Sequence, residues 1–380
     1  MKLKPLSLMV ALSLTGTTAS AAPWINIDAR SASMGGLSVV TSAIDVAAFN
    51  NPAMLAAGSE DDDFGLVIAA GATAADPNDF QGALDAFNTA YAAVVPDLDS
   101  VNAANAALAN LEGKGYLADA GGGLASAFKW GQWSSAFSVT LTTSNDFGVG
   151  SADSNPLSVN LGDGSTNAAL KGISVETQDI GLSLARNFEL NEEFDVSVGV
   201  TPKLQTITLG EANQALDIAG GATVDGLNIT TGTGNTSFNA DLGVVARYNQ
   251  NIRFGIAMRN IIAQSYDSPL TNSKIDIKPQ TRAGIAYTND FVTVGLDLDL
   301  VENTAYVSGT KSKYMIIGTE FNAWDVTQLR LGYRTNSLDS NDVQASIGLG
   351  IADTVNLGVM TNPSNPQAGT SAYLSFNLKL

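Results

Sequence analysis

The feature of this sequence that most constrains its fold is an alternation of apolar and polar residues with a period of two, clearest over Thr281–Leu300. Apolar residues such as Ile285 and Leu298 alternate with polar or small residues on both sides of Asn289-Asp290. Successive side chains of a β-strand point to opposite faces, whereas a helix repeats about every 3.6 residues. This stretch is therefore predicted to be a β-hairpin with one apolar face and one face that carries charge.

The alternation returns along most of the chain and predicts about fourteen strands, each near the length that crosses a bilayer at a tilt. The predicted strands are Phe64–Gly71, Leu117–Trp130, Gln132–Thr143, Ile173–Leu190, Glu193–Leu209, Thr236–Asn249, Asn251–Gln264, Ile275–Thr288, Phe291–Val301, Lys313–Asn322, Asp325–Thr335, Asp342–Ile351, Thr354–Thr361 and Ser371–Leu380. Tight turns alternate with longer links, which include 144–172 and 336–341. Because this arrangement is typical of outer-membrane barrels, we predict an all-β fold, a transmembrane antiparallel β-barrel.

Aromatic residues support the membrane barrel over the alternative of a soluble sandwich. They stand beside the tight turns, whereas a sandwich would bury them at mid-strand. The residues concerned are Phe128, Trp130, Trp133, Phe188, Phe194, Tyr248, Phe254, Tyr287, Phe291, Phe321 and Trp324. Amphipathic rings favour the membrane–water boundary, so this row predicts one interfacial girdle. No apolar run reaches the roughly eighteen residues of a spanning helix, so any membrane crossing would be made by strands.

The composition excludes several kinds of function. The chain has no Cys and no His, which removes thiolate and imidazole metal sites and every catalytic mechanism that needs those groups. We therefore expect no enzyme activity, no metal site and no cofactor. The 37 acidic residues against 19 basic ones give a net charge of −18, which argues against nucleic acid or anionic lipid headgroups as partners.

The N-terminus predicts export from the cytoplasm. Residues 1–21 have the pattern of a secretory signal peptide, with Lys2 and Lys4 at the basic end, Leu6–Leu14 as the apolar core and an A-x-A cleavage site at residues 19–21. With the barrel prediction, this indicates the outer membrane of a Gram-negative cell, in contact with its lipid.

Two segments interrupt the strand pattern. Residues 22–63 contain ARSASMGG at Ala29–Gly36 and AAFNNPAMLAAG at Ala47–Gly58, and we predict that they form a hatch or plug inside a barrel of residues 64–380. Gly35 and Gly36 permit a tight bend, and Pro52 restricts the residue before it. Residues 79–112 repeat apolar side chains every three or four positions, which predicts a helical insertion in the first extracellular loop.

If the apolar faces meet lipid, the charged faces enclose the lumen. Charged side chains would be costly in hydrocarbon, which supports this assignment. The candidate lumen charges are Arg247, Arg253, Arg259, Arg282, Asp297, Asp299, Glu320, Arg330 and Arg334. Two interpretations stay open: a hydrated, salt-bridged wall that only holds a plug in place, or a polar path that a solute crosses.

The motifs of residues 22–63 also resemble a known pattern, the N-terminal hatch of the FadL family of fatty acid and aromatic-hydrocarbon transporters and its PorV-type relatives. From these motifs to the GTEFNAW and LRLGY hairpin near its end, the chain resembles outer-membrane barrels of the TraF-type conjugal transfer family, not the thioredoxin-like TraF. The hatch-motif residues are Arg30, Gly35, Gly36, Asn51 and Pro52. Ligand contacts of the transporters do not map onto particular positions of this chain.

The resemblance implies FadL-like passive transport of hydrophobic small molecules across the outer membrane. A solute would be captured among the outer loops and would pass by movement of the hatch. The alternative is a non-transporting envelope component for conjugal transfer or secretion, with protein partners in the envelope. Both hypotheses stay open at this point.

Overall fold

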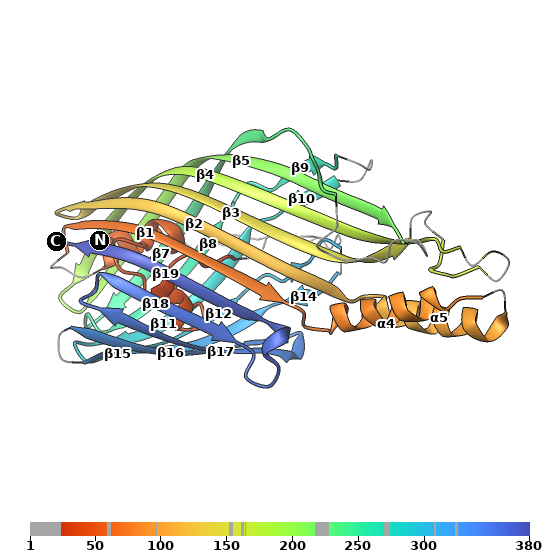
Figure 1. The fold of residues 1–380 in the computed structure, drawn as a ribbon. Coiled ribbons are helices and arrows are strands. Elements are labelled where there is room, and N and C mark those ends of the chain that lie inside the picture. Colours follow the sequence, from red (N-terminus) through yellow and green to blue (C-terminus); the bar gives the residue numbers. More distant parts are fainter. Residues whose placement is uncertain are drawn as a thin grey trace, which may run out of the picture.

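Strands dominate the computed structural model and form one large antiparallel sheet that closes on itself (Figure 1). The structure describes residues 24–58, 62–95, 97–151, 155–160, 163, 165–216, 228–269, 274–307, 309–323 and 326–380. The predicted signal peptide, residues 1–21, lies outside these residues. Fourteen strands form the ring, which the pairing of β4 with β5 completes, so the predicted all-β antiparallel barrel is confirmed.

Consecutive ring strands in the chain are also neighbours in the barrel. In order, the ring contains β1 (Phe64–Ala75), β2 (Gly115–Trp130), β3 (Trp133–Ser151), β4 (Ala168–Asn191), β5 (Phe194–Ala215), β7 (Asn235–Tyr248), β8 (Ile252–Arg259), β11 (Gln280–Thr288), β12 (Val292–Asp299), β15 (Tyr314–Ala323), β16 (Thr327–Asn336), β17 (Asp339–Ile351), β18 (Val355–Thr361) and β19 (Thr370–Lys379). The first and last strands of the ring in sequence, β1 and β19, also pair with each other.

The two faces of the ring differ as the alternation predicts. In the hairpin of β11 and β12, Ile285 and Leu298 are exposed on the outer face, while Arg282 lies opposite Asp299 on the buried inner face. Aromatic side chains are exposed beside the short turns at Phe128, Trp130, Trp133, Phe188, Tyr248, Phe254, Tyr287, Phe291 and Phe321. Trp324 lies outside the described residues.

The segment before β1 lies inside the ring (Figure 1). It contains three short helices, α1 (Ala29–Ser33), α2 (Ala47–Asn50) and α3 (Met54–Ala57), whose residues are almost all buried. The barrel wall facing this segment is built from small residues, and the inward alanines in contact with it are Ala125, Ala127, Ala136, Ala185, Ala257 and Ala286. Small side chains on the wall leave room for a folded segment in the lumen.

Two helices connect β1 to β2, α4 (Phe80–Ala92) and α5 (Leu98–Leu111), and they extend past the end of the barrel away from the C-terminus (Figure 1). Apolar residues on both helices, including Phe87 and Leu108, pack together with Leu170 at the start of β4. In the described part of the chain, no helix is both long enough and apolar enough to cross a membrane.

Short strands outside the ring lie at the same end of the barrel as α4 and α5. β6 (Thr230–Thr231) pairs with β5, β9 (Gln264–Asp267) pairs with β10 (Lys274–Ile277), and β13 (Asn303–Thr304) pairs with β14 (Lys311–Ser312). A 3-10 turn, η2 (Pro366–Ala368), precedes β19.

The prediction of one strand over 275–288 is wrong, because the structure has two strands there, β10 and β11. The predicted strand 251–264 is too long, because β8 ends at Arg259. Asn260 has a left-handed backbone with φ 53° and ends the ladder of β8, while Pro279, which lacks an N–H, separates β10 from β11. The residues around them form the separate hairpin of β9 and β10 instead.

Two predicted links are also wrong in extent. Residues 144–151 and 168–172 continue β3 and β4, because backbone pairing needs no apolar side chains. The predicted link 336–341 is a tight turn between β16 and β17, where the Asn336 side chain accepts hydrogen bonds from the backbone N–H groups of Lys313 and Leu338.

Candidate functional site

A buried ion-pair network fixes the N-terminal segment to the inner wall. The Arg30 guanidinium on α1 donates two hydrogen bonds of 2.8 Å to the Glu320 carboxylate on β15. Arg330 on β16 donates to the same carboxylate at 2.5 Å and to Asn356 at 2.7 Å. Arg30 also donates to the Thr41 carbonyl, so it links two parts of the segment to the wall.

A second connection joins the same segment to β11 and β12. Asp297 accepts hydrogen bonds from the backbone N–H groups of Ser38 at 2.8 Å and Val39 at 3.0 Å. Arg282 pairs with Asp299 at 2.7 Å and donates to the Gly36 carbonyl at 3.2 Å. These wall charges are therefore used to hold backbone groups of the N-terminal segment.

The hatch-motif residues allow the segment to approach the wall closely. Gly35 and Gly36 have φ values of 78° and 100°, which other residues rarely adopt. Asn51 donates a 2.7 Å hydrogen bond to the Val39 carbonyl. Pro52 lies so near β5 that a side chain at Gly199 would collide with its backbone.

The other predicted lumen charges are spread around the wall. Arg247 pairs with Asp195 at 2.7 Å. Arg259 donates to the Phe49 carbonyl and lies 4.0 Å from the ring centre of Trp24. Of the remaining two, Arg334 lines the outer cavity and Arg253 lines the inner cavity, and both cavities are described below.

The outer cavity, of about 140 Å³, lies beneath the long links of the barrel. Its wall includes the rings of Trp24, Tyr306, Tyr314 and Tyr373, and Arg334 lies 4.6 Å from the ring centre of Tyr314. Burial raises the pKa of the Tyr306 phenol, which keeps this residue neutral. The cavity therefore combines aromatic rings with charged side chains, among them Asp119, Asp146 and Arg334.

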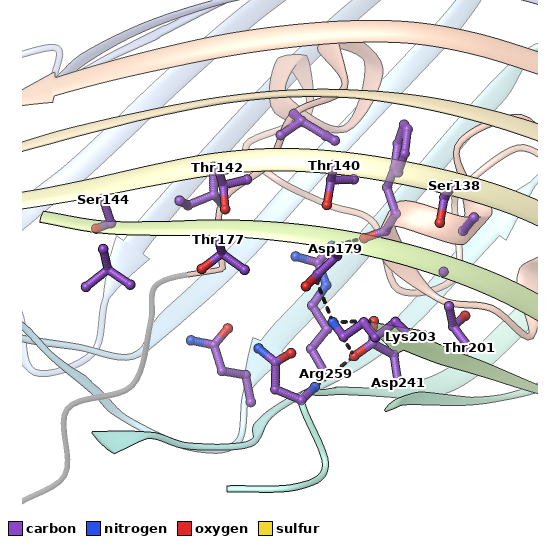
Figure 2. Close-up of a pocket in the computed structure, with 18 residues that line it drawn as sticks. Ser138, Thr140, Thr142, Ser144, Thr177, Asp179, Thr201, Lys203, Asp241 and Arg259 are labelled. Atoms are coloured by element: carbon purple, nitrogen blue, oxygen red, sulfur yellow. Dashed lines mark hydrogen bonds and ion pairs between the residues drawn. The ribbon is translucent and has the colours of Figure 1, made fainter. Parts of the chain in front are cut away.

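The wall cavity, of about 100 Å³, lies between the N-terminal segment and strands β3 to β5 (Figure 2). Lys203 lies at its edge and forms ion pairs with Asp179 at 2.9 Å and Asp241 at 3.0 Å. Much of the barrel side carries hydroxyl groups, at Ser138, Thr140, Thr142, Ser144, Thr177 and Thr201. We had not predicted Lys203 or Asp179 as site residues, although their positions on the inward parity of β5 and β4 follow from the alternation.

The inner cavity, of about 370 Å³, lies at the end with the short turns and is lined by Arg30, Asp45, Arg253 and Asp353 among others. The Nε atom of Arg253 has no hydrogen-bond partner among the described residues. Burial raises the pKa of Asp45, although the Asn377 side chain donates a hydrogen bond to it. Burial lowers the pKa of Arg30, but the charge and hydrogen bonds of Glu320, together with the charges of Asp45 and Asp28, raise it above its ordinary value.

The three cavities are arranged along the lumen. The outer and wall cavities share Ile25 and Ser144, so they adjoin, whereas the N-terminal segment stands between them and the inner cavity. Within the described residues, no group of acidic side chains is arranged to hold a metal ion. The outer and wall cavities therefore form one hollow region, which the N-terminal segment separates from the inner cavity.

The ring of fourteen strands makes the chain a closed antiparallel β-barrel, and two solved structures have a similar fold. The toluene transporter TbuX of Ralstonia pickettii is 12% identical over 93% of this chain and 98% of its own, with a TM-score of 0.54. A FadL homologue of Pseudomonas aeruginosa is 14% identical over 95% and 98%, with a TM-score of 0.50. At these identities the likeness shows the fold.

The family is shown by sequence. A family model described as "F plasmid transfer operon, TraF, protein" matches residues 48–299, and the chain belongs to this family. The resemblance found in the sequence is thereby confirmed. A sequence search of curated proteins found no match.

Proposed function

We propose that this protein is an outer-membrane channel through which small hydrophobic molecules pass passively. The outward face of the ring is apolar and has an aromatic girdle, which suits a bilayer. The N-terminal residues have the pattern of a signal peptide. The barrel shares its fold with a protein named a toluene transporter.

The outer cavity carries the proposal. Its aromatic rings, at Trp24, Tyr306, Tyr314 and Tyr373, offer an apolar solute buried area and ring contacts, while the polar and charged groups beside them would orient the solute. Trp24 of the N-terminal segment lines this cavity, and two arginines of the wall, Arg259 and Arg282, lie over its ring at 4.0 and 4.6 Å. A solute that displaces Trp24 would therefore disturb two of the wall arginines that contact the segment.

Filling the outer cavity tests this function. Ala75 on β1 is buried and lines the cavity, whereas the neighbouring Ala74 is exposed on the outer face. We expect Ala75→Phe to lower uptake of labelled toluene or fatty acid in a deletion strain to the level of the empty vector. Ala74→Phe, which adds the same volume on the lipid side, should restore uptake fully.

Both variants must reach the outer membrane in equal amounts for the comparison to hold. Equal uptake by the two variants would show that the outer cavity is not on the route. Uptake that does not change when the gene is deleted would contradict transport itself.

The family description favours a second candidate, a non-transporting envelope component of conjugal transfer. This hypothesis predicts that deletion lowers plasmid transfer between cells, and that in-cell crosslinking recovers an envelope protein. Transfer at the wild-type rate together with no crosslinked partner would remove it.

A further inference from the structure

An arginine occupies the outward apolar row of β4. The other members of this row are Ile180, Leu182, Leu184, Phe188 and Leu190, and all of them are exposed. Arg186 follows the same parity, because its neighbour Ala185 is buried inside. Among the described ring strands, no other basic side chain lies on the outward face. A charge on the lipid face costs free energy unless it is paired or lies near the headgroups.

Arg186 lies within the aromatic girdle beside the short turns. It is directly opposite Trp133 in the ladder, and Trp133 is opposite Trp130. Its guanidinium carbon is 5.0 Å from the ring centre of Trp133 and 4.8 Å from that of Phe188. The girdle marks the membrane–water boundary, so the guanidinium lies at the depth of lipid headgroups.

The two aromatic rings leave hydrogen-bonding capacity unused. The face of an aromatic ring attracts the positive charge of the guanidinium. It does not accept hydrogen bonds from the N–H groups, which lie in the plane of the guanidinium. The Nε atom of Arg186 is buried and has no hydrogen-bond partner among the described residues, so a lipid oxygen would be met by the two terminal nitrogens of the guanidinium. A planar fork of N–H donors matches the oxygens of a phosphate group.

We propose that Arg186, held by Trp133 and Phe188, binds the headgroup phosphate of a phospholipid in the periplasmic leaflet. The inference rests on the proposed location in the outer membrane, and the leaflet follows from the short turns at this end of the barrel. The rings would contact the glycerol and the first acyl carbons of the same lipid. The chain carries a net charge of −18, so general attraction to anionic lipid does not account for such binding.

Lipid retention tests the site. The protein would be inserted into phosphatidylglycerol nanodiscs and released in a mass spectrometer that preserves non-covalent complexes, and the fraction that keeps one phospholipid would be measured. We expect Arg186→Gln to lower this fraction by about tenfold, because a charge-assisted hydrogen bond is lost. Arg186→Lys should give an intermediate loss, since Lys keeps the charge but not the fork. Lys274→Gln removes an exposed positive charge outside the ring and should have no effect.

The outcomes separate this inference from the proposed function. If all variants insert and retain lipid equally, the lipid site is wrong while the membrane channel stands. If the wild type itself does not insert, both are wrong. If Arg186→Gln fails to insert, the Arg186→Lys variant provides the test. Reduced lipid retention by Arg186→Lys would support the lipid site, and lipid retention equal to the wild type would overturn it.

Discussion

At the scale of single residues, the lumen is organised around one carboxylate. Glu320 is 6% exposed and forms ion pairs with Arg30 from the N-terminal segment and with Arg330 from the adjacent strand. Removing one partner from a buried ion pair leaves an uncompensated charge, which costs more than the pair itself contributes. Glu320 therefore links the stability of the segment to that of the wall.

We expect Glu320→Gln to lower the free energy of unfolding by roughly 3 to 5 kcal/mol, because two arginines would lose their counter-charge. Urea unfolding of the protein in lipid vesicles measures this change. Glu302→Gln is the matched control, since its pair with Lys311 is about half exposed and contributes at most about 1 kcal/mol. Equal losses in the two variants would contradict the role given to Glu320.

Asp45 gives the lumen a dependence on pH. Its pKa is raised by burial above the ordinary value of 3.8, so the folded protein binds this proton more tightly than the unfolded chain. The contribution of Asp45 to stability is therefore complete below about pH 4 and is lost as the pH rises through the folded pKa. Asp45→Asn, which keeps an oxygen acceptor for Asn377, should show a smaller decline of stability with pH.

The measurement is a series of unfolding curves from about pH 4 to neutral pH, with wild type and Asp45→Asn in parallel. The difference between them should grow in favour of the variant as the pH rises. Parallel curves at every pH would show that the Asp45 carboxyl has the same pKa in both states.

The sequence could predict which charges face inward but not which ones pair. The period of two placed Glu320, Arg330 and Asp297 on one face, and all three are buried inside the barrel. Arg30 and Glu320 are 290 residues apart in sequence, and nothing local indicates that the lumen segment brings them together. Lys203 was not among the candidate lumen charges, although the same alternation places it inward.

At the scale of elements, hairpins were predictable where side chains alternate and turns are tight. The turn at Ala352-Asp353 has φ values of 51° and 53°, and the one at Asn249-Gln250 has 46° and 60°. Two left-handed residues make the kind of turn whose twist suits a hairpin. Strand ends beyond the apolar band were not predictable, because polar side chains at both faces leave no periodic signal.

The N-terminal segment can be locked to the wall by a disulfide. The native chain has no Cys, so an engineered pair reacts only with itself. A Cβ added at Gly358 on β18 would lie 3.5 Å from the Ser33 Cβ on α1, within the range of about 3.5 to 4.5 Å found in disulfides. If solutes pass by movement of the segment, oxidised Ser33→Cys/Gly358→Cys protein should lose uptake, and a reducing agent should restore it.

A disulfide within the wall is the matched control. A Cβ at Gly210 on β5 would lie 3.3 Å from the Ser174 Cβ on β4, just below that range, and 2.7 Å from the Ile229 side chain. With a small shift of both, Gly210→Cys/Ser174→Cys links two strands and leaves the segment free. This control should transport in both redox states. Full uptake by the oxidised Ser33/Gly358 pair would show that α1 stays in place during passage.

At the scale of the whole molecule, closure of the ring decides whether the chain can enter a bilayer. β1 pairs with β2 on one side and β19 on the other, and Phe64 and Leu380 exchange backbone hydrogen bonds of 2.9 and 3.1 Å at the seam. An open edge in hydrocarbon would leave backbone groups without partners, at a cost of several kcal/mol each. The last strand is therefore required for assembly, whatever the solute.

A chain that ends at Thr361 lacks β19 and leaves edges on β1 and β18. We expect it to give no heat-modifiable band on gels and no outer-membrane fraction, because the ring cannot close. Phe376→Ala keeps every backbone hydrogen bond of the seam and removes one exposed ring, so it should still assemble. If the truncated chain is recovered as a water-soluble, folded monomer, the apolar outer face does not meet lipid, and the membrane channel and the lipid site are both wrong.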